Sequence, residues 1–297
     1  MVVIAIAGGA GGLGRTIAEV VIRQRKHQVK ILSRSSNPKL AAEIGCEIIP
    51  VDYDNIESMT KILEDNKIDT VISTIFLTTS ATPQNNLALA ADASKVTRRF
   101  VPSIWGVPIT PEQATGFVIG QVKLEGLEVL KKTSLEHTRF YMGFFLDYWG
   151  YPRVPTYQTP MIMAIDIENE GSSSSRLGEH PGLWDEQSYI LGEKVTWSEF
   201  VKIAEEVKGK KFKVTHDSLE FLSTGKVTEL PCHSAIYPVM PKEDAQGLMS
   251  LFGRFFHDGL FNLSPEKTLN QIFPDIKVLT VRDVLERGWG GVEETAL

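Results

Sequence analysis

The chain opens on a short apolar strand that runs directly into a cluster of glycines. Residues 2–7, VVIAIA, are rich in β-branched side chains, which is typical of a buried strand of a parallel sheet. Residues 8–14 are GGAGGLG, and around and behind them apolar residues recur at helical spacing, namely Leu13, Ile17, Val20 and Val21. Strand, glycine turn and helix in this order form the context that a dinucleotide-binding fingerprint requires.

The glycines of this turn have separate physical tasks. One allows the tight turn, one lets the backbone approach a pyrophosphate, and one lets the helix pack close to the strand. The start of the helix adds free N–H groups and the positive end of a dipole. We predict that the turn binds a dinucleotide through Gly8, Gly9, Gly11, Gly12, Leu13 and Gly14. A glycine turn with only a structural role is the alternative.

The end of the second predicted strand, residues 29–34, carries a base where NAD-binding proteins carry an acid. An Asp or Glu there would bind the ribose 2′-hydroxyl of NAD. This chain has Arg34 among serines, with Lys39 shortly after it. A guanidinium can bind a 2′-phosphate through two parallel hydrogen bonds. We therefore predict NADP(H) rather than NAD(H), the alternative being an arginine solvated in a loop.

Strands and helices alternate through the first half of the chain. Strands are predicted at 46–51, 70–75, 99–102 and 137–141, and helices at 56–64, from Pro83 onward, and near 118–132. The alternation predicts an α/β fold of the Rossmann-like, doubly wound parallel type, in which ligands lie beyond the carboxyl ends of the strands. Asp52, Thr74 and Ser103 lie at such ends. We expect Asp52 to meet the adenine amino group and Thr74 to line the pocket floor, with ordinary loop capping as the alternative.

Composition narrows the class of protein. The 297 residues carry a formal charge of −6, and 42% of them are hydrophobic, which supports a folded core without a broad basic face for nucleic acid. No run approaches the ~18 apolar residues of a membrane span, and no leader segment is expected before the first strand. The two cysteines favour a reducing, cytoplasmic setting. The six histidines are scattered, so no metal site is expected.

Several stretches resemble one known family. Residues 98–106, RRFVPSIWG, are similar to the "RFxPSxWG" stretch of NmrA-like and isoflavone reductase-like proteins, which are atypical short-chain dehydrogenases. Residues 141–149, YMGFFLDYW, resemble the family's "GxFxDY" segment, and residues 192–200 and 209–214 resemble its C-terminal subdomain. The glycine turn and Arg34 fit the same family. The resemblance spans nearly the whole chain and is greatest to fungal members.

The resemblance implies a catalytic lysine. Reductases of this family use a lysine on the helix after the fifth strand, and Lys123 matches that position. A lysine that loses water beside a bound nicotinamide has a lowered pKa, which suits proton transfer, and it could also hold the ribose hydroxyls. A solvated helix lysine is the alternative.

Three features depart from family patterns. The Tyr-x-x-x-Lys pair of typical short-chain dehydrogenases is absent, because Phe145 follows four residues after Tyr141. Ile104 replaces the usual acid of the "PSEWG" stretch. A serine run, Ser172–Ser175, stands where a strand and helix are usual, and we expect a flexible loop there that could weaken substrate binding.

The second half is predicted to be a small, mainly helical substrate subdomain. We expect a cofactor domain over 1–150 and this subdomain over 151–297, with part of 155–192 returning to the sheet. Helix starts are predicted at Thr196, Asp217, Ser264 and Thr280. Aromatic residues such as Phe252, Phe255 and Phe261 are expected mostly to fill its core. Tyr148 and Trp149 are the candidate substrate-pocket residues.

Two functions remain open from the sequence. The first is a cytoplasmic NADPH-dependent reductase of secondary metabolism, acting on a carbonyl or conjugated double bond of a small aromatic or polyketide-like metabolite. The second is a non-catalytic NAD(P)-binding redox sensor that contacts a regulatory protein. The glycine turn, Arg34 and Lys123 favour the enzyme, whereas Ile104 and the serine run favour the sensor.

Overall fold

The computed structural model describes residues 1–150, 184–238, 240–275 and 278–290. These residues divide into two units. The first unit contains Met1–Met142 together with the described residues of 165–191 and 265–278. The second contains the described residues of 143–164, 192–264 and 279–297. Each unit is therefore assembled from segments that are far apart in the sequence.

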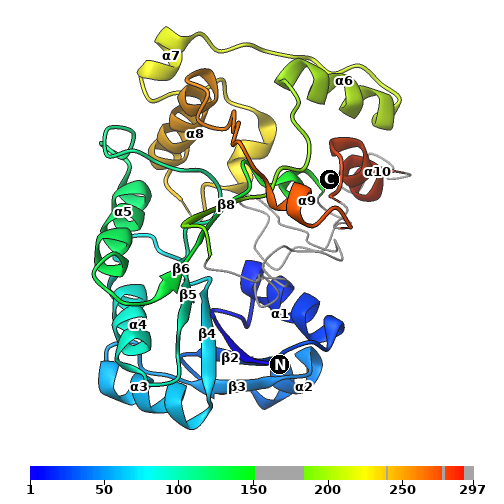
Figure 1. The fold of residues 1–297 in the computed structure, drawn as a ribbon. Coiled ribbons are helices and arrows are strands. Elements are labelled where there is room, and N and C mark those ends of the chain that lie inside the picture. Colours follow the sequence, from blue (N-terminus) through cyan, green and yellow to red (C-terminus); the bar gives the residue numbers. More distant parts are fainter. Residues whose placement is uncertain (151–183, 239, 276–277, 291–297) are drawn as a thin grey trace. The chain divides into compact units, whose positions relative to one another are not determined.

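A parallel sheet forms the centre of the first unit (Figure 1). Its strand order is β3-β2-β1-β4-β5-β6, so the chain winds outward from β1 in both directions. The strands are β1 (Val3–Ala7), β2 (Gln28–Ser33), β3 (Glu47–Pro50), β4 (Ile68–Ser73), β5 (Arg99–Val101) and β6 (Glu136–His137). This order confirms the doubly wound α/β prediction and places a topological switch point between β1 and β4, where such sheets bind ligands.

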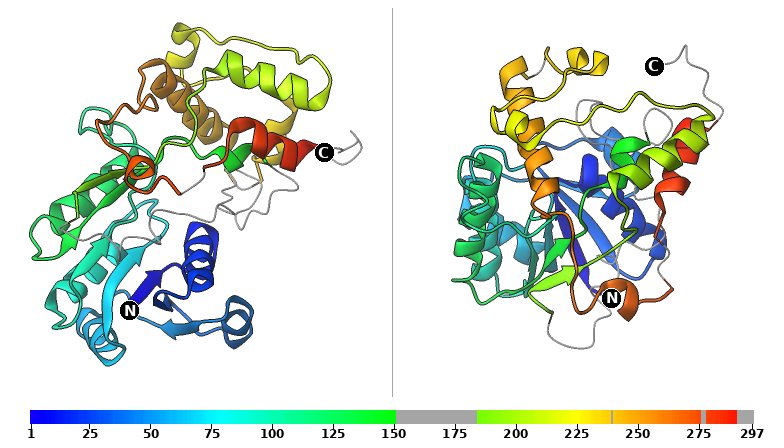
Figure 2. Two further views of the ribbon diagram at one scale, coloured as in Figure 1. Left: turned by 45° about the vertical axis from the view of Figure 1, so that its right-hand side comes forward. Right: turned by 90° about the horizontal axis from the view of Figure 1, so that it is seen from above.

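Helices cover both faces of this sheet. They are α1 (Gly12–Gln24), α2 (Pro38–Ile44), α3 (Ile56–Asp65), α4 (Thr82–Ala93) and α5 (Val118–Leu130). The views agree that α1 and α2 lie on one face and that α3, α4 and α5 lie on the other (Figures 1 and 2). Right-handed crossovers between parallel strands produce this arrangement when the winding reverses at the central strand.

The core of the first unit follows the two-residue period of its strands. Ala5 and Ala7 of β1 face the helices α3 and α4, in a cluster with fully buried Leu63, Leu87 and Phe100. Ile4 and Ile6 alternate with them and are also buried, on the α1 face. Small alanines on one side of β1 let α3 and α4 pack closely there. Burying each large apolar side chain stabilises the unit by about 1.5–3 kcal/mol.

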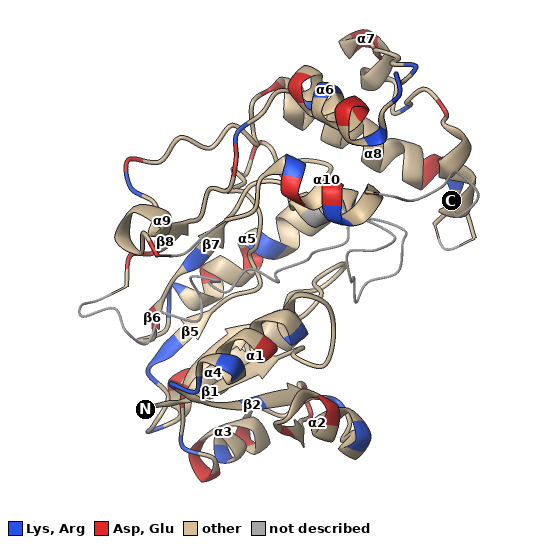
Figure 3. Ribbon diagram, turned by 90° about the vertical axis from the view of Figure 1, so that its right-hand side faces the viewer, with Lys and Arg blue, Asp and Glu red and all other residues tan. Residues whose placement is uncertain are grey.

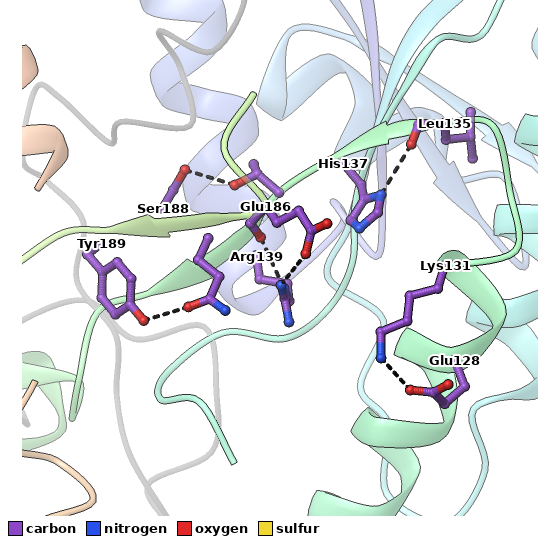
Figure 4. Close-up of polar contacts among 10 residues, drawn as sticks. Glu128, Lys131, Leu135, His137, Arg139, Glu186, Ser188 and Tyr189 are labelled. Carbon is purple, nitrogen blue, oxygen red and sulfur yellow. Dashed lines mark hydrogen bonds and ion pairs between the residues drawn. The ribbon is translucent and has the colours of Figure 1, made fainter. Parts of the chain in front are cut away.

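The strand predicted at 137–141 is two strands in different sheets. Residues 136–137 form β6 beside β5, whereas β7 (Arg139–Tyr141) pairs in parallel with β8 (Gln187–Tyr189). Thr138 separates them, is fully buried, and shares a 2.8 Å hydrogen bond with Ser188. Arg139 bonds the backbone and carboxylate of Glu186 at the start of this pair (Figure 4). The break depends on residues about fifty positions away, which periodicity within one segment does not reveal.

The second unit is mainly helical. Its elements are η1 (Leu146–Trp149), α6 (Trp197–Lys208), α7 (Leu219–Ser223), η3 (Pro231–Ala235), α8 (Lys242–His257) and α10 (Val281–Trp289). The short helix α9 (Leu269–Ile272) belongs to the first unit. Figure 3 shows charged residues of both signs on α6 and α10, and Arg282 of α10 pairs with Glu206 of α6. Beneath them Phe200, Ala204 and Leu285 are buried together.

Two of the four predicted helix starts in this half are correct. Thr196 and Thr280 form capping boxes, with Glu199 and Asp283 respectively, at the starts of α6 and α10. The other two predictions are wrong. Ser218 rather than Asp217 caps α7, because the Asp217 carboxylate instead accepts hydrogen bonds from Thr228. No helix begins at Ser264, whose hydroxyl accepts a bond from Lys194, and α9 starts after Thr268.

Replacing Thr196 by Ala should lower the free energy of unfolding of the second unit by about 1 kcal/mol. The substitution removes the side-chain acceptor for the Glu199 N–H and leaves that donor without its cap. Urea unfolding followed by tryptophan fluorescence checks this, because Trp149 and Trp197 lie in the same unit. Thr196→Ser keeps the hydroxyl and should behave like the parent chain. Equal losses in both variants would show that the cap is not the cause.

Candidate functional site

The glycine turn leaves β1 with backbone angles that favour glycine. Gly8 has φ +79° and Gly12 has φ +53°, both in the left-handed region that L side chains rarely adopt. The Gly8 N–H donates to the Leu32 carbonyl at 3.1 Å, which extends the pairing of β1 and β2 by one bond. The turn is therefore fixed to the carboxyl ends of the central strands, where the sequence predicted the ligand.

Packing explains some of the glycines but not Gly11. A Cβ atom on Gly14 would lie 2.3 Å from Thr74 Oγ1 and 2.6 Å from the Gly8 carbonyl oxygen, so the fold itself requires glycine there. A Cβ on Gly8 would lie 2.9 Å from the Thr74 carbonyl oxygen. A Cβ on Gly11 would meet nothing within 4 Å, and its extended φ of −162° suits any residue. Close approach of a ligand is the remaining physical reason for glycine at this position.

The first turn of α1 presents its backbone N–H groups without a side-chain cap. Gly11 is the N-cap residue and makes no side-chain capping bond, and the first turn contains no acidic residue. Helices otherwise commonly carry Ser, Thr, Asp or Asn at this position. Leu13 is buried, so its side chain anchors the helix while its backbone belongs to the exposed end. The arrangement suits an anion, since the N-terminus carries partial positive charge.

The basic residues after β2 lie at the same edge of the sheet. Arg34 and Lys39 are both exposed, Lys39 in the first turn of α2. Asn37 caps α2 by accepting the Leu40 N–H at 3.0 Å, which fixes the short loop between them. The Arg34 charge also reaches Tyr53: burial raises the pKa of this phenol, and the guanidinium partly opposes that rise. Both cations are available to an anionic ligand group.

Asp52 follows β3 and Thr74 follows β4, and each of the two side chains hydrogen-bonds the backbone. One Asp52 carboxylate oxygen accepts the Asp54 N–H at 3.0 Å, in a turn that leaves the side chain exposed. The Thr74 hydroxyl donates to the Ala7 carbonyl at 2.7 Å and lies directly against Gly8 and Gly14. Thr74 thus packs beneath the glycine turn. Contact of either side chain with a cofactor stays a prediction.

Lys123 lies on α5 beside the loop that follows β5. Its Nζ donates to the Trp105 carbonyl oxygen at 3.2 Å, and burial lowers the pKa of this amine to about 8. Trp105 is itself held by a 3.1 Å bond from its Nε1 to the Ser73 carbonyl oxygen and by stacking on Phe140. A chain of contacts therefore connects the lysine through Trp105 and Ser73 to Thr74 at the glycine turn.

Comparison with known proteins decides the family. The model of the NmrA-like family matches residues 2–223, about three quarters of the 297-residue chain. The chain belongs to the NmrA-like family. A relative from Botryotinia fuckeliana (strain B05.10), named Oxidoreductase BOA1, is 30% identical over 93% of this chain and 96% of that protein. The family resemblance in the RRFVPSIWG stretch and the glycine turn is thereby confirmed.

Solved structures show the same fold as this NmrA-like protein. AtPrR2 with NADP+ and (+)pinoresinol matches with a TM-score of 0.72 over 96% of this chain and 98% of that one, at 16% identity. Isoflavone reductase matches with a TM-score of 0.65 over 96% and 98%, also at 16% identity. At this identity the likeness concerns the fold, and it confirms the predicted Rossmann-like architecture.

Of the two predicted substrate residues, the structure describes the side chain of Trp149. Trp149 packs in the second unit against Phe144, Trp197 and Phe200, with ring centroids 5.1–6.3 Å apart. It thus contributes to the aromatic core of that unit. The Tyr148 side chain and the serine run 172–175 of this NmrA-like chain lie outside what the structure describes. A role of either aromatic residue in substrate binding stays a prediction.

Three contacts at the site were not anticipated from the sequence. Gln84 Oε1 accepts the Ser103 N–H at 2.6 Å, and Asn85 Nδ2 donates to Glu125 on α5 at 3.3 Å. Arg15 joins α1 to Glu43 of α2 at 2.7 Å. For Gln84 and Asn85 the sequence did contain a signal, because these two polar residues lie on the face of α4 that is otherwise made of leucine and alanine. Their partners are 19 and 40 residues away.

Among the described residues, no three His, Cys, Asp or Glu side chains are grouped so that they could hold a metal ion. No helix within the described ranges is long and apolar enough to span a membrane.

Proposed function

We propose that this NmrA-like protein is an NADP(H)-dependent oxidoreductase that reduces a carbonyl or conjugated C=C of a small aromatic or polyketide-like metabolite. The observation that carries the proposal is the chain of contacts from the glycine turn to Lys123. Gly14 abuts Thr74, Trp105 donates to the neighbouring Ser73, and Lys123 donates to Trp105. The glycine turn would hold the phosphates of the dinucleotide, and the partly desolvated amine of Lys123 would face its nicotinamide end.

The residues present fit NADP(H). The open space at Gly11 admits a pyrophosphate, and the uncapped start of α1 offers it backbone N–H groups. Arg34 and Lys39 would bind the 2′-phosphate, Asp52 would meet the adenine amino group, and Ser103 would line the inner end. The bound cofactor would supply the hydride. The name of AtPrR2 with NADP+ supports this choice of cofactor.

Lys123 would act as the proton donor or stabilise negative charge on the substrate. Its amine loses part of its hydration in the protein, so its protonated form is a better acid than a lysine in water. The Trp105 carbonyl orients the ammonium by accepting a hydrogen bond from one of its three N–H groups, which leaves two N–H groups for the substrate and the cofactor ribose. The amine would donate a proton to the reduced substrate or stabilise its developing negative charge.

The proposed substrate class follows the names of structural relatives. Pinoresinol and isoflavones are small aromatic molecules, and the relative from Botryotinia fuckeliana carries the name of an oxidoreductase. A small-molecule partner is therefore proposed, within secondary metabolism. Ile104, one of the departures from the family pattern, is buried at 4% exposure, so an apolar residue suits its surroundings.

The test is oxidation of NADPH by the purified chain against a panel of aromatic ketones and enones. Turnover with at least one compound is the expected result. Tight NADPH binding without turnover across the panel would instead favour the redox-sensor hypothesis. In that case capture of a stable protein partner from the native host would be the expected finding.

Replacing Arg34 by Ala should weaken NADPH binding by roughly 10- to 150-fold and leave NADH binding nearly unchanged. A charge-assisted hydrogen bond contributes about 1.5–3 kcal/mol, and only NADPH carries the 2′-phosphate that would receive it. Fluorescence titration with both cofactors measures the effect. Lys61→Ala on α3 is the control, since it removes a cation from an exposed face. Equal weakening for both cofactors would contradict the assigned role.

A further inference from the structure

The side chain of Gln84 lies between the two segments that determine where Lys123 is placed. It is 2% exposed at the start of α4, so the side chain is almost entirely buried. Its Oε1 accepts the Ser103 N–H at 2.6 Å, at the beginning of the loop that leads to Trp105. A Cβ built on Gly126 of α5 would lie 3.0 Å from its Nε2. One amide group thus bonds the loop and lies beside α5, with no room for a larger side chain at Gly126.

The loop and α5, which both lie next to Gln84, each supply one partner of the hydrogen bond between Lys123 and Trp105. The loop supplies the acceptor, the Trp105 carbonyl, and α5 supplies the donor, Lys123 Nζ, three residues before Gly126. A buried amide that loses its partner is costly, so the Ser103 contact strongly favours a single loop position. Asn85, the next residue, donates to Glu125 of α5 at 3.3 Å, and this engages the acidic residue nearest to Lys123 along the helix.

We infer that Gln84 is a positioning residue for Lys123, which fixes the Trp105 carbonyl and α5 at the separation that the lysine hydrogen bond requires. The inference rests on the proposed function, in which Lys123 contacts substrate and cofactor. Gln84 itself would contact neither. It would set the geometry of the amine and exclude water from it, because a well-packed neighbour prevents the loop from moving away.

The test measures Lys123 directly, without relying on turnover. Competitive acetylation at a range of pH values, followed by mass spectrometry, reports the pKa and reactivity of each lysine in the folded chain. In the parent chain Lys123 should titrate near 8. In Gln84→Leu the loop loses its acceptor and water reaches the amine, so the titration should move toward the ordinary value of 10.5. The turnover number should fall by about tenfold or more, with the Kd for NADPH changed less than about threefold.

Two further variants keep the inference open to refutation. Gly126→Ala retains every hydrogen-bonding group but crowds the Gln84 amide, and it should move the Lys123 titration in the same direction by a smaller amount. Thr97→Val removes a buried 2.8 Å hydrogen bond to the Ile68 carbonyl, at the amino-terminal ends of β4 and β5. It serves as a control for general destabilisation and should leave the Lys123 titration unchanged.

The outcomes separate the positioning role from the proposed function. An unchanged Lys123 titration in folded Gln84→Leu and Gly126→Ala would overturn the inference. An equal change in Thr97→Val would also overturn it, since a nonspecific loosening would then be the cause. A shifted titration with unchanged turnover would support the positioning role and count against Lys123 as the catalytic residue.

Discussion

Lys123→Met should lower turnover with NADPH by roughly 100- to 10,000-fold, the range over which a positioned acid or base contributes to catalysis. Methionine keeps most of the apolar length of the side chain but cannot donate a proton or bond the Trp105 carbonyl. The Kd for NADPH should change little, because in the proposed function the glycine turn and Arg34 would hold the phosphates. Steady-state kinetics and fluorescence titration together measure the two effects.

The same substitution has a pH-dependent effect whose sign follows from burial. The pKa of Lys123 is lowered from 10.5 to about 8 in the folded chain. Between these values the unfolded chain binds more protons than the folded one, so stability rises with pH across that interval. Lys123→Met removes this dependence and should gain most in relative stability below pH 8. In the parent enzyme, reduction should slow as pH rises through about 8, because the donor loses its proton.

A matched lysine separates loss of the amine from loss of a positive charge. Lys131 follows the last turn of the same helix, is exposed, and pairs with Glu128 at 2.6 Å (Figure 4). Lys131→Met should keep turnover within about twofold of the parent, since exposed ion pairs contribute little. If Lys123→Met also kept its turnover, Lys123 would have no part in the reaction.

Gly11→Ala should lose NADPH affinity without losing stability, whereas Gly14→Ala should lose stability. Gly11→Ala should fold normally, because its methyl group would meet nothing within 4 Å. It should lose NADPH affinity by about tenfold or more, because that methyl group would occupy the space that we propose for the pyrophosphate. Gly14→Ala should destabilise the first unit by about 1–3 kcal/mol, because its methyl group would lie 2.3 Å from Thr74 Oγ1 and 2.6 Å from the Gly8 carbonyl oxygen.

Thermal unfolding with and without NADPH distinguishes the two variants. A ligand that binds only the folded state stabilises it by RT ln(1 + [L]/Kd), so at one ligand concentration a weaker binder raises the melting temperature less. Gly11→Ala should match the parent without NADPH and gain less stabilisation from it. Gly14→Ala should melt earlier in both conditions. Full stabilisation of Gly11→Ala by NADPH would show that the phosphates do not lie on this turn.

Local signals predicted the parts of the molecule that depend on neighbouring residues. The glycine turn, the alternation of strands and helices in a parallel sheet and the capping boxes at Thr196 and Thr280 all follow from short patterns. Asp217 shows where such patterns fail. Its spacing to Glu220 resembles a capping box, yet Thr228 competes for its carboxylate and Ser218 caps the helix.

The parts that could not be predicted depend on contacts between distant segments. Gln84 is a polar residue in an apolar helix until its partner Ser103 is placed beside it by the sheet. The sequence around Thr138 predicts a continuous strand, but its hydroxyl bonds Ser188 where the chain passes from β6 in one sheet to β7 in the other. In both cases the sequence contains a polar group that needs a hydrogen-bond partner, and only the fold determines which residue that partner is.

The interleaving of the two units affects how this protein can be made and divided. β8 and α9 complete the first unit, and the Leu191 N–H bonds Asn270 within it. A gene fragment ending near residue 150 would lack β8 and leave one edge of β7 without its partner strand. During synthesis the first unit cannot finish assembling until the ribosome has released residues of α9. Production of either unit alone would require new joints between segments that the natural chain keeps apart.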